Sequence, residues 1–334
     1  MNKVLENIAR VVSENRGSYE VINKRGRFLA KITGKQMIKA SSREDYPVVG
    51  DWVEITEIDS RLALINKILP RKTMIRRSRG NNEIQIIGTN IDVAFVVESV
   101  NHDYNLNRLE RYFTILRDEN IKMVVVFNKI DLISKKEIEE IISQTKKRFD
   151  IVDIILTNAL DEKGTDDLKK YIEKDKTYCF LGSSGVGKSS LINKLIGEEN
   201  IKTGEINEYN ERGRHITVRR EMYFLKNGGM VIDNPGIRGV GIANTKVEDS
   251  FDQISKIAKK CRYKDCSHIN EPGCAVLRAL KAGKLDESKY NNYINLKKES
   301  EFYEMSEIEK RKKDKDFGKF IKEAKKEIDK YNNY

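Results

Sequence analysis

A glycine-rich stretch, GSSGVGKSS at residues 182–190, has the residue types and spacing that suit phosphate binding. Gly182 and Gly187 are separated by four residues and are followed directly by Lys188 and Ser189, which fits the P-loop pattern. In that loop, backbone N–H groups converge on phosphate oxygens at the start of a helix. An apolar run precedes the stretch and a helical run follows it. The sequence therefore predicts a nucleotide site, with a glycine turn that binds no nucleotide as the alternative.

Two side chains of this loop have specific expected roles. Lys188 would reach the β- and γ-phosphates, and Ser189 would bind Mg²⁺. The residues expected to contact the nucleotide here are Gly182, Ser183, Ser184, Gly185, Val186, Gly187, Lys188, Ser189 and Ser190.

A second motif, NKID at residues 128–131, follows a buried apolar run. It is the tetrapeptide with which GTPases recognise guanine. Asp131 could accept hydrogen bonds from the ring N–H and the exocyclic amine of guanine, a pair that adenine lacks, so it would select GTP over ATP. Asn128 would brace the loop, and the stem of Lys129 would cover the base.

Two further patterns follow the glycine-rich loop. DNPG at residues 233–236 ends an expected strand and offers the Asp233 carboxylate to the Mg²⁺ shell and the Gly236 N–H to the γ-phosphate. GRHIT at residues 213–217 places Thr217 where it could close over Mg²⁺ in the triphosphate state.

The residue that would orient the attacking water differs from the usual one. Ile237 stands directly after Gly236, where many GTPases have Gln, and its side chain cannot form hydrogen bonds. We expect slow intrinsic hydrolysis. His215 is the candidate replacement because an imidazole can hold water and titrates near neutral pH. The alternative is that His215 contacts RNA or packs the loop.

The order of the motifs is reversed relative to an ordinary GTPase, in which the guanine motif follows the phosphate motifs. A circular permutation accounts for this order, with residues 173–177 as the connector between the original termini.

A Cys/His cluster lies C-terminal to these motifs. Cys261, Cys266, His268 and Cys274 supply three thiolates and an imidazole, which suits tetrahedral zinc. Four protein ligands leave no open position, so we expect one structural Zn²⁺ per chain. Buried free thiols with a surface histidine are the alternative.

The elements that would position these residues change character along the chain. Residues 1–75 contain five short β-type runs separated by turns, which predicts a small barrel of the OB or SH3-like kind, and OB barrels often bind oligonucleotides. Trp52 is expected in the barrel core, with a base-stacking platform as the alternative. The basic run at 71–79 is expected to be a linker that could lie along RNA, with a solvated linker as the alternative. The runs expected to be strands are 8–12, 19–22, 28–32, 51–58 and 62–68.

From Ile91 the pattern alternates between apolar strands and amphipathic helices, which indicates an α/β domain with a largely parallel sheet. Beyond Cys274 the sequence predicts a helix at 275–282 and then a long polar helical region. Between Ile91 and Cys274 the sequence predicts strands at 92–97, 122–127, 151–156, 178–181, 221–225 and 230–233, and helices at 106–119, 135–149 and 165–172.

Charge is spread unevenly along the 334 residues, which carry a formal net charge of +11. Residues 1–80 have 17 basic and 9 acidic side chains, residues 81–254 have 25 and 29, and residues 255–334 have 21 and 14. The basic ends suggest contact with a polyanion such as RNA, although a merely solubilising surface is the alternative.

The sequence also indicates where the chain works. It contains no apolar stretch near eighteen residues, and its first residues are charged where a signal peptide would be apolar. Three of the four cysteines fall in the metal-type cluster, which is expected in a reducing compartment. We expect a cytoplasmic monomer with no membrane contact.

The motif order NKxD, P-loop, GRHxT and DxPG, between a small barrel and a Cys/His cluster, resembles the RsgA (YjeQ/YloQ) family of bacterial circularly permuted GTPases. The resemblance covers nearly the whole chain and includes GDWV at 50–53, LPR at 69–71 and NLNRLERY at 105–112. It implies an OB-fold RNA-binding barrel at 1–75, a circularly permuted P-loop GTPase domain at 76–250 and an α-helical zinc-binding domain at 251–334.

The resemblance also implies a function. Members bind the small ribosomal subunit and its rRNA late in subunit assembly, and the subunit stimulates hydrolysis of GTP to GDP. The four zinc ligands of the family match this chain one for one. An adaptor that binds GTP and rRNA without hydrolysis is the alternative function.

The chain departs from the family at a few positions. Asn234 stands where Thr is usual, Ile216 and Val218 stand where threonine is common, and Asn158 replaces Ser in the Ser-Ala pair that backs the base. Since the family's base contact there is the backbone N–H of the alanine, Ala159 is expected to keep it.

Overall fold

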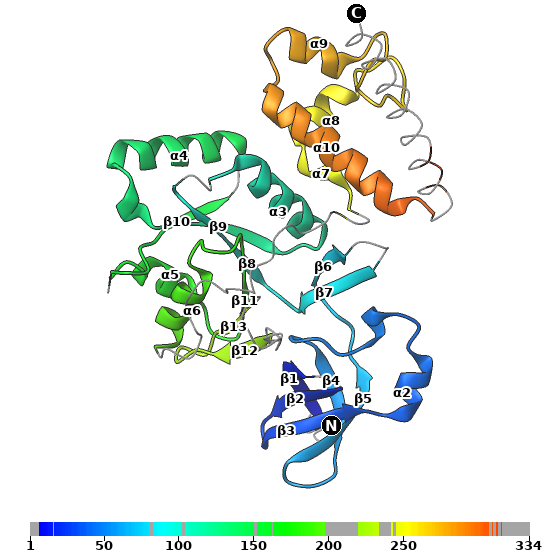
Figure 1. The fold of residues 1–334 in the computed structure, drawn as a ribbon, viewed down its shortest axis with the longest axis vertical. Helices are drawn as coiled ribbons and strands as arrows, with labels where there is room; N and C mark the ends of the chain where they lie inside the picture. The colour runs from blue at the N-terminus through cyan, green and yellow to red at the C-terminus, as the bar shows by residue number, and fades with distance from the viewer. Residues whose placement is uncertain are drawn as a thin grey trace, which may run out of the picture. The chain divides into compact units, whose positions relative to one another are not determined.

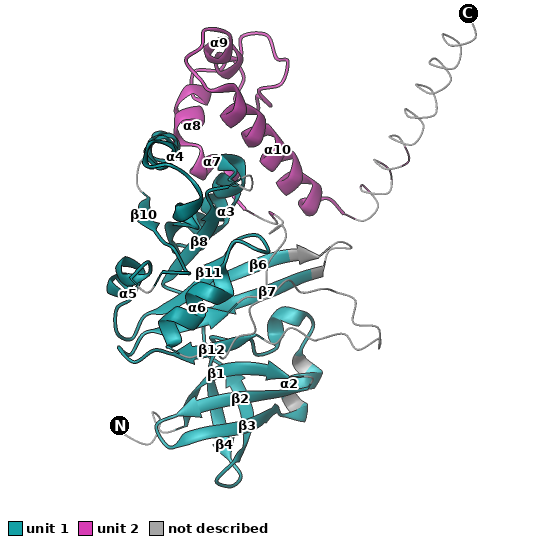
Figure 2. Ribbon diagram, turned by 60° about the vertical axis from the view of Figure 1, so that its left-hand side comes forward, with its two compact units in different colours: residues 1–241 teal, residues 242–334 magenta. Residues whose placement is uncertain are grey.

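The structure is a computed structural model, and it divides into two compact units, residues 1–241 and 242–334 (Figure 2). The residues that it describes are 7–15, 17–79, 83–101, 104–149, 152–161, 163–197, 220–233, 242, 245–306, 309, 312 and 315.

The first unit begins with a closed five-stranded barrel, as expected for residues 1–75. The sheet order is β1–β2–β3–β5–β4, and β1 also pairs with β4 to close it. A short helix, α2 (Gly34–Lys39), connects β3 to β4 and was not expected from the sequence. Inward side chains of alternate strand positions, such as Val21, Phe28 and Ile65, fill the barrel. The strands are β1 (Ile8–Asn15), β2 (Ser18–Asn23), β3 (Gly26–Ile32), β4 (Trp52–Glu57) and β5 (Leu62–Ile68).

The expectation that Trp52 lies in the barrel core is wrong. Its side chain is 39% exposed, whereas Val53 and Ile55 on the same strand are almost fully buried. Because side chains alternate across a strand, Val53 and Ile55 of β4 point into the barrel and Trp52 points outward. The Arg10 guanidinium lies 4.7 Å from the centre of the indole ring and covers part of it.

The basic run at residues 71–79 is also not a linker. It contains β6 (Met74–Arg79), which pairs antiparallel with β7 (Glu83–Thr89). Arg71 donates to both carboxylate oxygens of Asp51 at 2.8 Å, and Arg76 forms ion pairs with Glu44 and Glu119. These cations are neutralised by carboxylates distant in sequence, which the local charge pattern could not reveal.

A six-stranded sheet follows in the order β10–β9–β8–β11–β13–β12, in which β12 alone is antiparallel to its neighbour (Figure 1). The expected strands and helices of the α/β domain are confirmed to within a few residues. The strands are β8 (Val93–Ser99), β9 (Lys122–Asn128), β10 (Asp153–Leu156), β11 (Thr177–Leu181), β12 (Glu221–Phe224) and β13 (Met230–Asp233). The helices are α3 (Leu106–Asp118), α4 (Lys135–Arg148), α5 (Asp166–Tyr171) and α6 (Lys188–Ile196), with a short 3₁₀ helix η2 (Ile130–Leu132).

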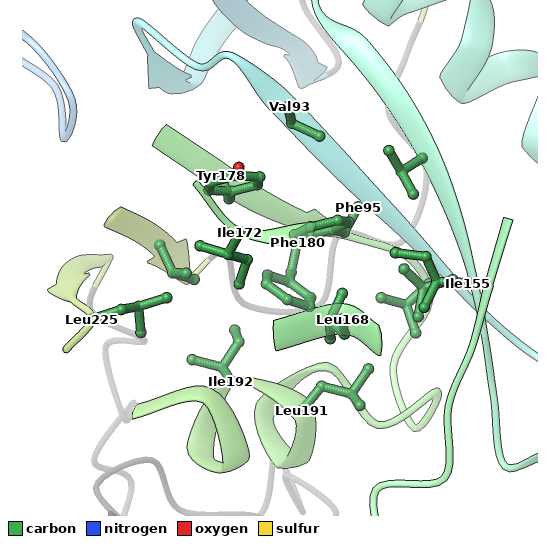
Figure 3. Packing of buried hydrophobic residues seen from close by; sticks show 14 of the residues in the cluster. Val93, Phe95, Ile155, Leu168, Ile172, Tyr178, Phe180, Leu191, Ile192 and Leu225 are labelled. Carbon is green, nitrogen blue, oxygen red and sulfur yellow. The ribbon is translucent and has the colours of Figure 1, made fainter. Parts of the chain in front are cut away.

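The core of this sheet is built from strands that are buried on both faces, which explains why they read as continuous apolar runs. All seven residues of β8 are buried. The rings of Phe95, Tyr178 and Phe180 lie together in Figure 3, and the Phe95 centroid is 5.2 Å from each of the other two. Leu191 and Ile192 of α6 belong to the same cluster, so the helix that follows the P-loop is anchored in the core.

The barrel and the α/β sheet form one continuous sheet, because β1 pairs antiparallel with β12 at Ser13 and Glu221. The buried Arg10 strengthens the junction by donating to Thr177 Oγ1 at 3.1 Å and to the carbonyl of Asn90 at 3.2 Å. Burial lowers the pKa of Arg10 to about 10, and the charge of Asp51 opposes that shift.

The second unit is helical, with a core that includes Phe251, Ile254, Tyr293 and Leu296. The helix expected at 275–282 is confirmed. Among the described residues, no helix has the length and apolar character that a membrane crossing requires. The helices of the second unit are α7 (Val247–Ser250), α8 (Asp252–Ala258), α9 (Ala275–Lys281) and α10 (Glu287–Glu304).

Candidate nucleotide site and metal centre

The two predicted nucleotide motifs lie at the same edge of the sheet. Strands β11, β8 and β9 are parallel neighbours, and their carboxyl ends therefore meet at one edge. The glycine-rich loop follows β11, and NKID begins at the last residue of β9. Ligands of open α/β sheets bind at such an edge.

Backbone geometry explains the glycines of the loop. Gly182 has a φ of +139°, and a Cβ there would lie 2.3 Å from the carbonyl oxygen of Val97. Gly187 has a φ of +97°, and a Cβ there would lie 2.2 Å from Nδ2 of Asn128. Any side chain would collide at both positions, so glycine lets the loop turn tightly and begin α6.

Lys188 lies folded over the loop and is 6% exposed. Its ammonium donates to the carbonyls of Gly182 at 2.8 Å and of Ser183 at 2.5 Å. This places a positive charge within the loop, where the phosphates of a nucleotide are expected.

Asp233 ends β13 and is the acid expected in the Mg²⁺ shell. Burial raises its pKa to about 6, the Lys188 charge opposes the shift, and the Glu221 charge adds to it. A cation beside this carboxyl group would favour its ionised form. The environment of Asp233 therefore suits a metal ligand.

Asn128 connects the guanine motif to the P-loop. Its side chain is almost fully buried, and Nδ2 donates to the carbonyl of Val186 at 2.8 Å. Oδ1 accepts from Thr157 Oγ1 at 3.1 Å and from the backbone N–H of Ala159 at 3.3 Å. One amide thus holds three loops together, and its role in bracing the nucleotide site stays a prediction.

The residues predicted to read the base follow directly in the chain. Lys129 has the left-handed backbone conformation with a φ of 63°, and the next residue, Ile130, donates its N–H to Thr157 at 3.4 Å. Asp131 follows in η2 and is exposed, so its carboxylate is accessible to a ligand.

The expected base contact of Ala159 stays a prediction, because in this structure its N–H points to Asn128 rather than outward. Asn158 accepts from the Leu160 N–H at 3.0 Å through Oδ1 and shapes the same loop. Gly164 was missed by the sequence analysis, although a Cβ there would lie 2.2 Å from the Asn158 carbonyl. The only sequence signal was an isolated glycine before α5.

A supporting network beneath the P-loop was also missed. Glu98 at the end of β8 is fully buried and pairs with Arg108, whose Nε lies 2.7 Å from Oε1. Burial raises the pKa of Tyr112 to about 12, and a hydrogen bond with the Gly182 backbone opposes that shift. Tyr112 of the NLNRLERY segment thus contacts the start of the loop, and Arg108 of the same segment holds Glu98. Three other candidates, His215, Thr217 and Gly236, lie outside the described residues.

The four predicted metal ligands come together in the second unit. Their ligand atoms all lie within 4.8 Å of one another. Nδ1 of His268 is 3.6 Å from the Cys261 sulfur and 3.5 Å from the Cys274 sulfur, and these two sulfurs are 3.9 Å apart. Sulfurs that are each 2.3 Å from a tetrahedral metal lie about 3.8 Å apart, so the cluster fits Zn²⁺.

Other groups orient these ligands. Backbone N–H groups at the start of α9 donate to the Cys261 and Cys274 sulfurs at 3.3 and 3.4 Å and fix their positions. Tyr290 donates to the His268 carbonyl at 2.7 Å. Glu271, which the sequence analysis missed, accepts the Ser267 N–H at 2.9 Å and fixes the loop between the ligands.

We expect a Cys266→Ala protein to lose its zinc and the protease resistance of residues 245–306. Removing one of four ligands opens the tetrahedral shell, and so small a unit depends on the metal for part of its folding free energy. Cys179→Ala is the matched control, because Cys179 is buried in β11 and lies outside the cluster. Metal analysis should return one zinc for the control and none for the variant. Full zinc retention in Cys266→Ala would remove that residue from the ligand set.

Comparison with known proteins is consistent with this geometry. The model of the RsgA GTPase family matches residues 68–243. A small ribosomal subunit biogenesis GTPase, RsgA 1 of Bacteroides thetaiotaomicron, is 38% identical over 95% of this chain and 90% of its own length. RsgA 2 of Listeria monocytogenes is 38% identical over 88% of this chain and 84% of its own. The crystal structure of YjeQ from Thermotoga maritima superposes with a TM-score of 0.64 at 25% identity and covers 87% of this chain and 96% of that one. YloQ, described as a circularly permuted GTPase, has a TM-score of 0.62 at 22% identity and covers 90% and 96%.

Proposed function

Since the chain belongs to the RsgA GTPase family, we propose that it binds the small ribosomal subunit and hydrolyses GTP to GDP in a subunit-stimulated reaction during late subunit assembly. GTP hydrolysis is the activity of the family. The relatives that match over most of the chain are named for small-subunit biogenesis, which supports the choice of partner.

The observation that carries this proposal is the Asn128 side chain. It is hydrogen-bonded to the P-loop at Val186 and to the loop that ends at Ala159. A phosphate-binding loop and a guanine-type motif are thereby held at a fixed separation at one sheet edge. One GTP can occupy both only in such an arrangement.

In the proposed site, each group has a separate task. Lys188 and the loop N–H groups bind the phosphates, and Asp131 selects guanine. Mg²⁺ would be held by Ser189 and Thr217 with Asp233 in its shell, and it would neutralise charge on the phosphates. Gly236 would meet the γ-phosphate, and His215 would orient the attacking water. The motif positions and the geometry of the described members support these roles.

The remaining assignments are proposals of the same kind. The barrel and the basic ends would contact rRNA, the Cys/His cluster would hold one structural Zn²⁺, and the protein would act as a cytoplasmic monomer. The barrel supports RNA contact because several of its basic side chains are exposed, among them Lys24, Arg27 and Lys31.

The test is GTP turnover measured with and without purified small subunits. We expect slow turnover alone and strong stimulation by the small subunit. Large subunits serve as a control for general RNA effects and should not stimulate. Nucleotide binding with no turnover in either condition would favour the adaptor that uses GTP only as a ligand.

A further inference from the structure

A cavity of about 480 Å³ lies in the first unit, and none of the predicted nucleotide-site residues lines it. Its walls come from β1, β2 and β3 of the barrel, from α2, from the loop at residues 43–48 and from β7. Arg220, directly before β12, completes it. The volume is in the range of small-ligand pockets.

One wall of this cavity is aromatic and apolar. Tyr19 is buried, Tyr46 is half-buried, and Met37 is 56% exposed although its side chain is apolar. Flat or polarisable side chains that remain accessible in a concave site are suited to stacking against a nucleobase.

The rest of the lining is cationic. The lining contains three cations, Lys31, Arg43 and Arg220, and one carboxylate, that of Glu14. Arg220 already has protein partners, because its Nη1 donates to the Ile86 carbonyl at 2.9 Å and lies 4.0 Å from the Glu14 carboxylate. Among the residues that the structure describes, Lys31 and Arg43 have no ion-pair partner.

The acids beside Arg43 in the sequence are engaged elsewhere. Asp45 accepts hydrogen bonds from the backbones of Ser41 and Ser42 at 2.8 and 2.9 Å, and Glu44 pairs with Arg76 at 3.1 Å. The charges of Lys31 and Arg43 are therefore left available for an anion.

We propose that this cavity binds one nucleotide of a single-stranded RNA, with the base against Tyr46 and Met37 and the flanking phosphates at Lys31 and Arg43. The inference rests on the proposed function in that the RNA would belong to the ribosomal subunit. A peptide strand is disfavoured on the barrel side because β1, β2 and β3 are each paired on both sides. Among the described strands, β7 pairs only with β6, but the Ile86 carbonyl there already accepts from Arg220 at 2.9 Å.

The test is a fluorescence anisotropy titration of the full chain with a fluorescein-labelled uridine octanucleotide over a series of salt concentrations. Tyr46→Ala should weaken binding about tenfold with an unchanged salt slope, because it removes stacking but no charge. Tyr46→Phe should bind like the wild type. Arg43→Ala should lower the salt slope by about 0.7, the value for one phosphate contact on a single strand.

Phe224→Ala is the matched control, since Phe224 is an exposed aromatic side chain of β12 that lies outside the cavity lining and outside the basic ends, and its loss should leave oligonucleotide binding unchanged. All variants should keep wild-type GTP affinity, which verifies folding. Wild-type binding by Tyr46→Ala, or equal affinity of the wild type for uridine monophosphate and the octanucleotide, would overturn the proposal. Small-subunit stimulation of GTP turnover is measured separately, so failure of the proposed function and failure of this pocket give different results.

Discussion

An Asp131→Asn protein is expected to bind xanthine nucleotides in preference to guanine nucleotides. The Asp131 carboxylate would accept two hydrogen bonds from guanine, whereas the amide of Asn presents a donor toward groups that are already donors. Xanthine has a carbonyl in place of the amine and can accept from that amide. Sites that hydrogen-bond a substrate group reject an analogue lacking it by roughly 10⁴-fold, so the loss of GTP affinity should approach that size. Competition titrations with GTP, xanthosine triphosphate and ATP measure it.

Asp161→Asn is the control for this change, because Asp161 is an exposed carboxylate of the neighbouring loop outside the NKID motif. Among the described residues, its carboxylate accepts only from the Lys163 N–H, at 3.1 Å. That variant should keep guanine preference. If wild-type protein bound ATP as tightly as GTP, Asp131 would have no role in base selection.

Sequence patterns predicted most of the fold because they are local. The strands of the central sheet are short apolar runs that burial on both faces produces, and helices such as Leu106–Asp118 show one apolar stripe. The patterns failed where partners are distant in sequence. The sequence around Arg76 suggests a charged linker, because its ion-pair partners Glu44 and Glu119 are distant in sequence. The pairing of β1 with β12 likewise joins segments about 200 residues apart.

In the candidate site, too, local features were predictable from the sequence and contacts between distant segments were not. Each motif could be found from its own residues, because glycine, lysine and aspartate positions follow from the chemistry of phosphate and guanine. The contact of Asn128 with Val186, 58 residues away, and the steric need for glycine at 187 arise only from packing. Ala159 was assigned by resemblance, but its N–H is directed to Asn128, a contact that requires knowing how two loops lie together.

Hydrolysis requires a group that orients water, and the usual position is filled by Ile237, which cannot form hydrogen bonds through its side chain. In GTPases whose site is completed by a partner, the completion is worth roughly 10⁵-fold in turnover. His215, two residues before Thr217, is the sequence-based candidate, and an imidazole near neutral pH can accept a proton from water or hold it by a hydrogen bond. Its role therefore concerns the stimulated rate rather than nucleotide affinity.

We expect His215→Ala to keep GTP affinity and small-subunit affinity near the wild-type values while it loses most of the subunit-stimulated turnover, a loss that can approach the roughly 10⁵-fold stimulation of partner-dependent GTPases. Single-turnover hydrolysis with saturating small subunits measures the effect without contributions from product release. His215→Gln should retain part of the rate, because an amide can still hold water, whereas Ile216→Ala should leave it unchanged, since that side chain offers no hydrogen bond. Full stimulated turnover in His215→Ala would show that another residue, or the subunit itself, orients the water.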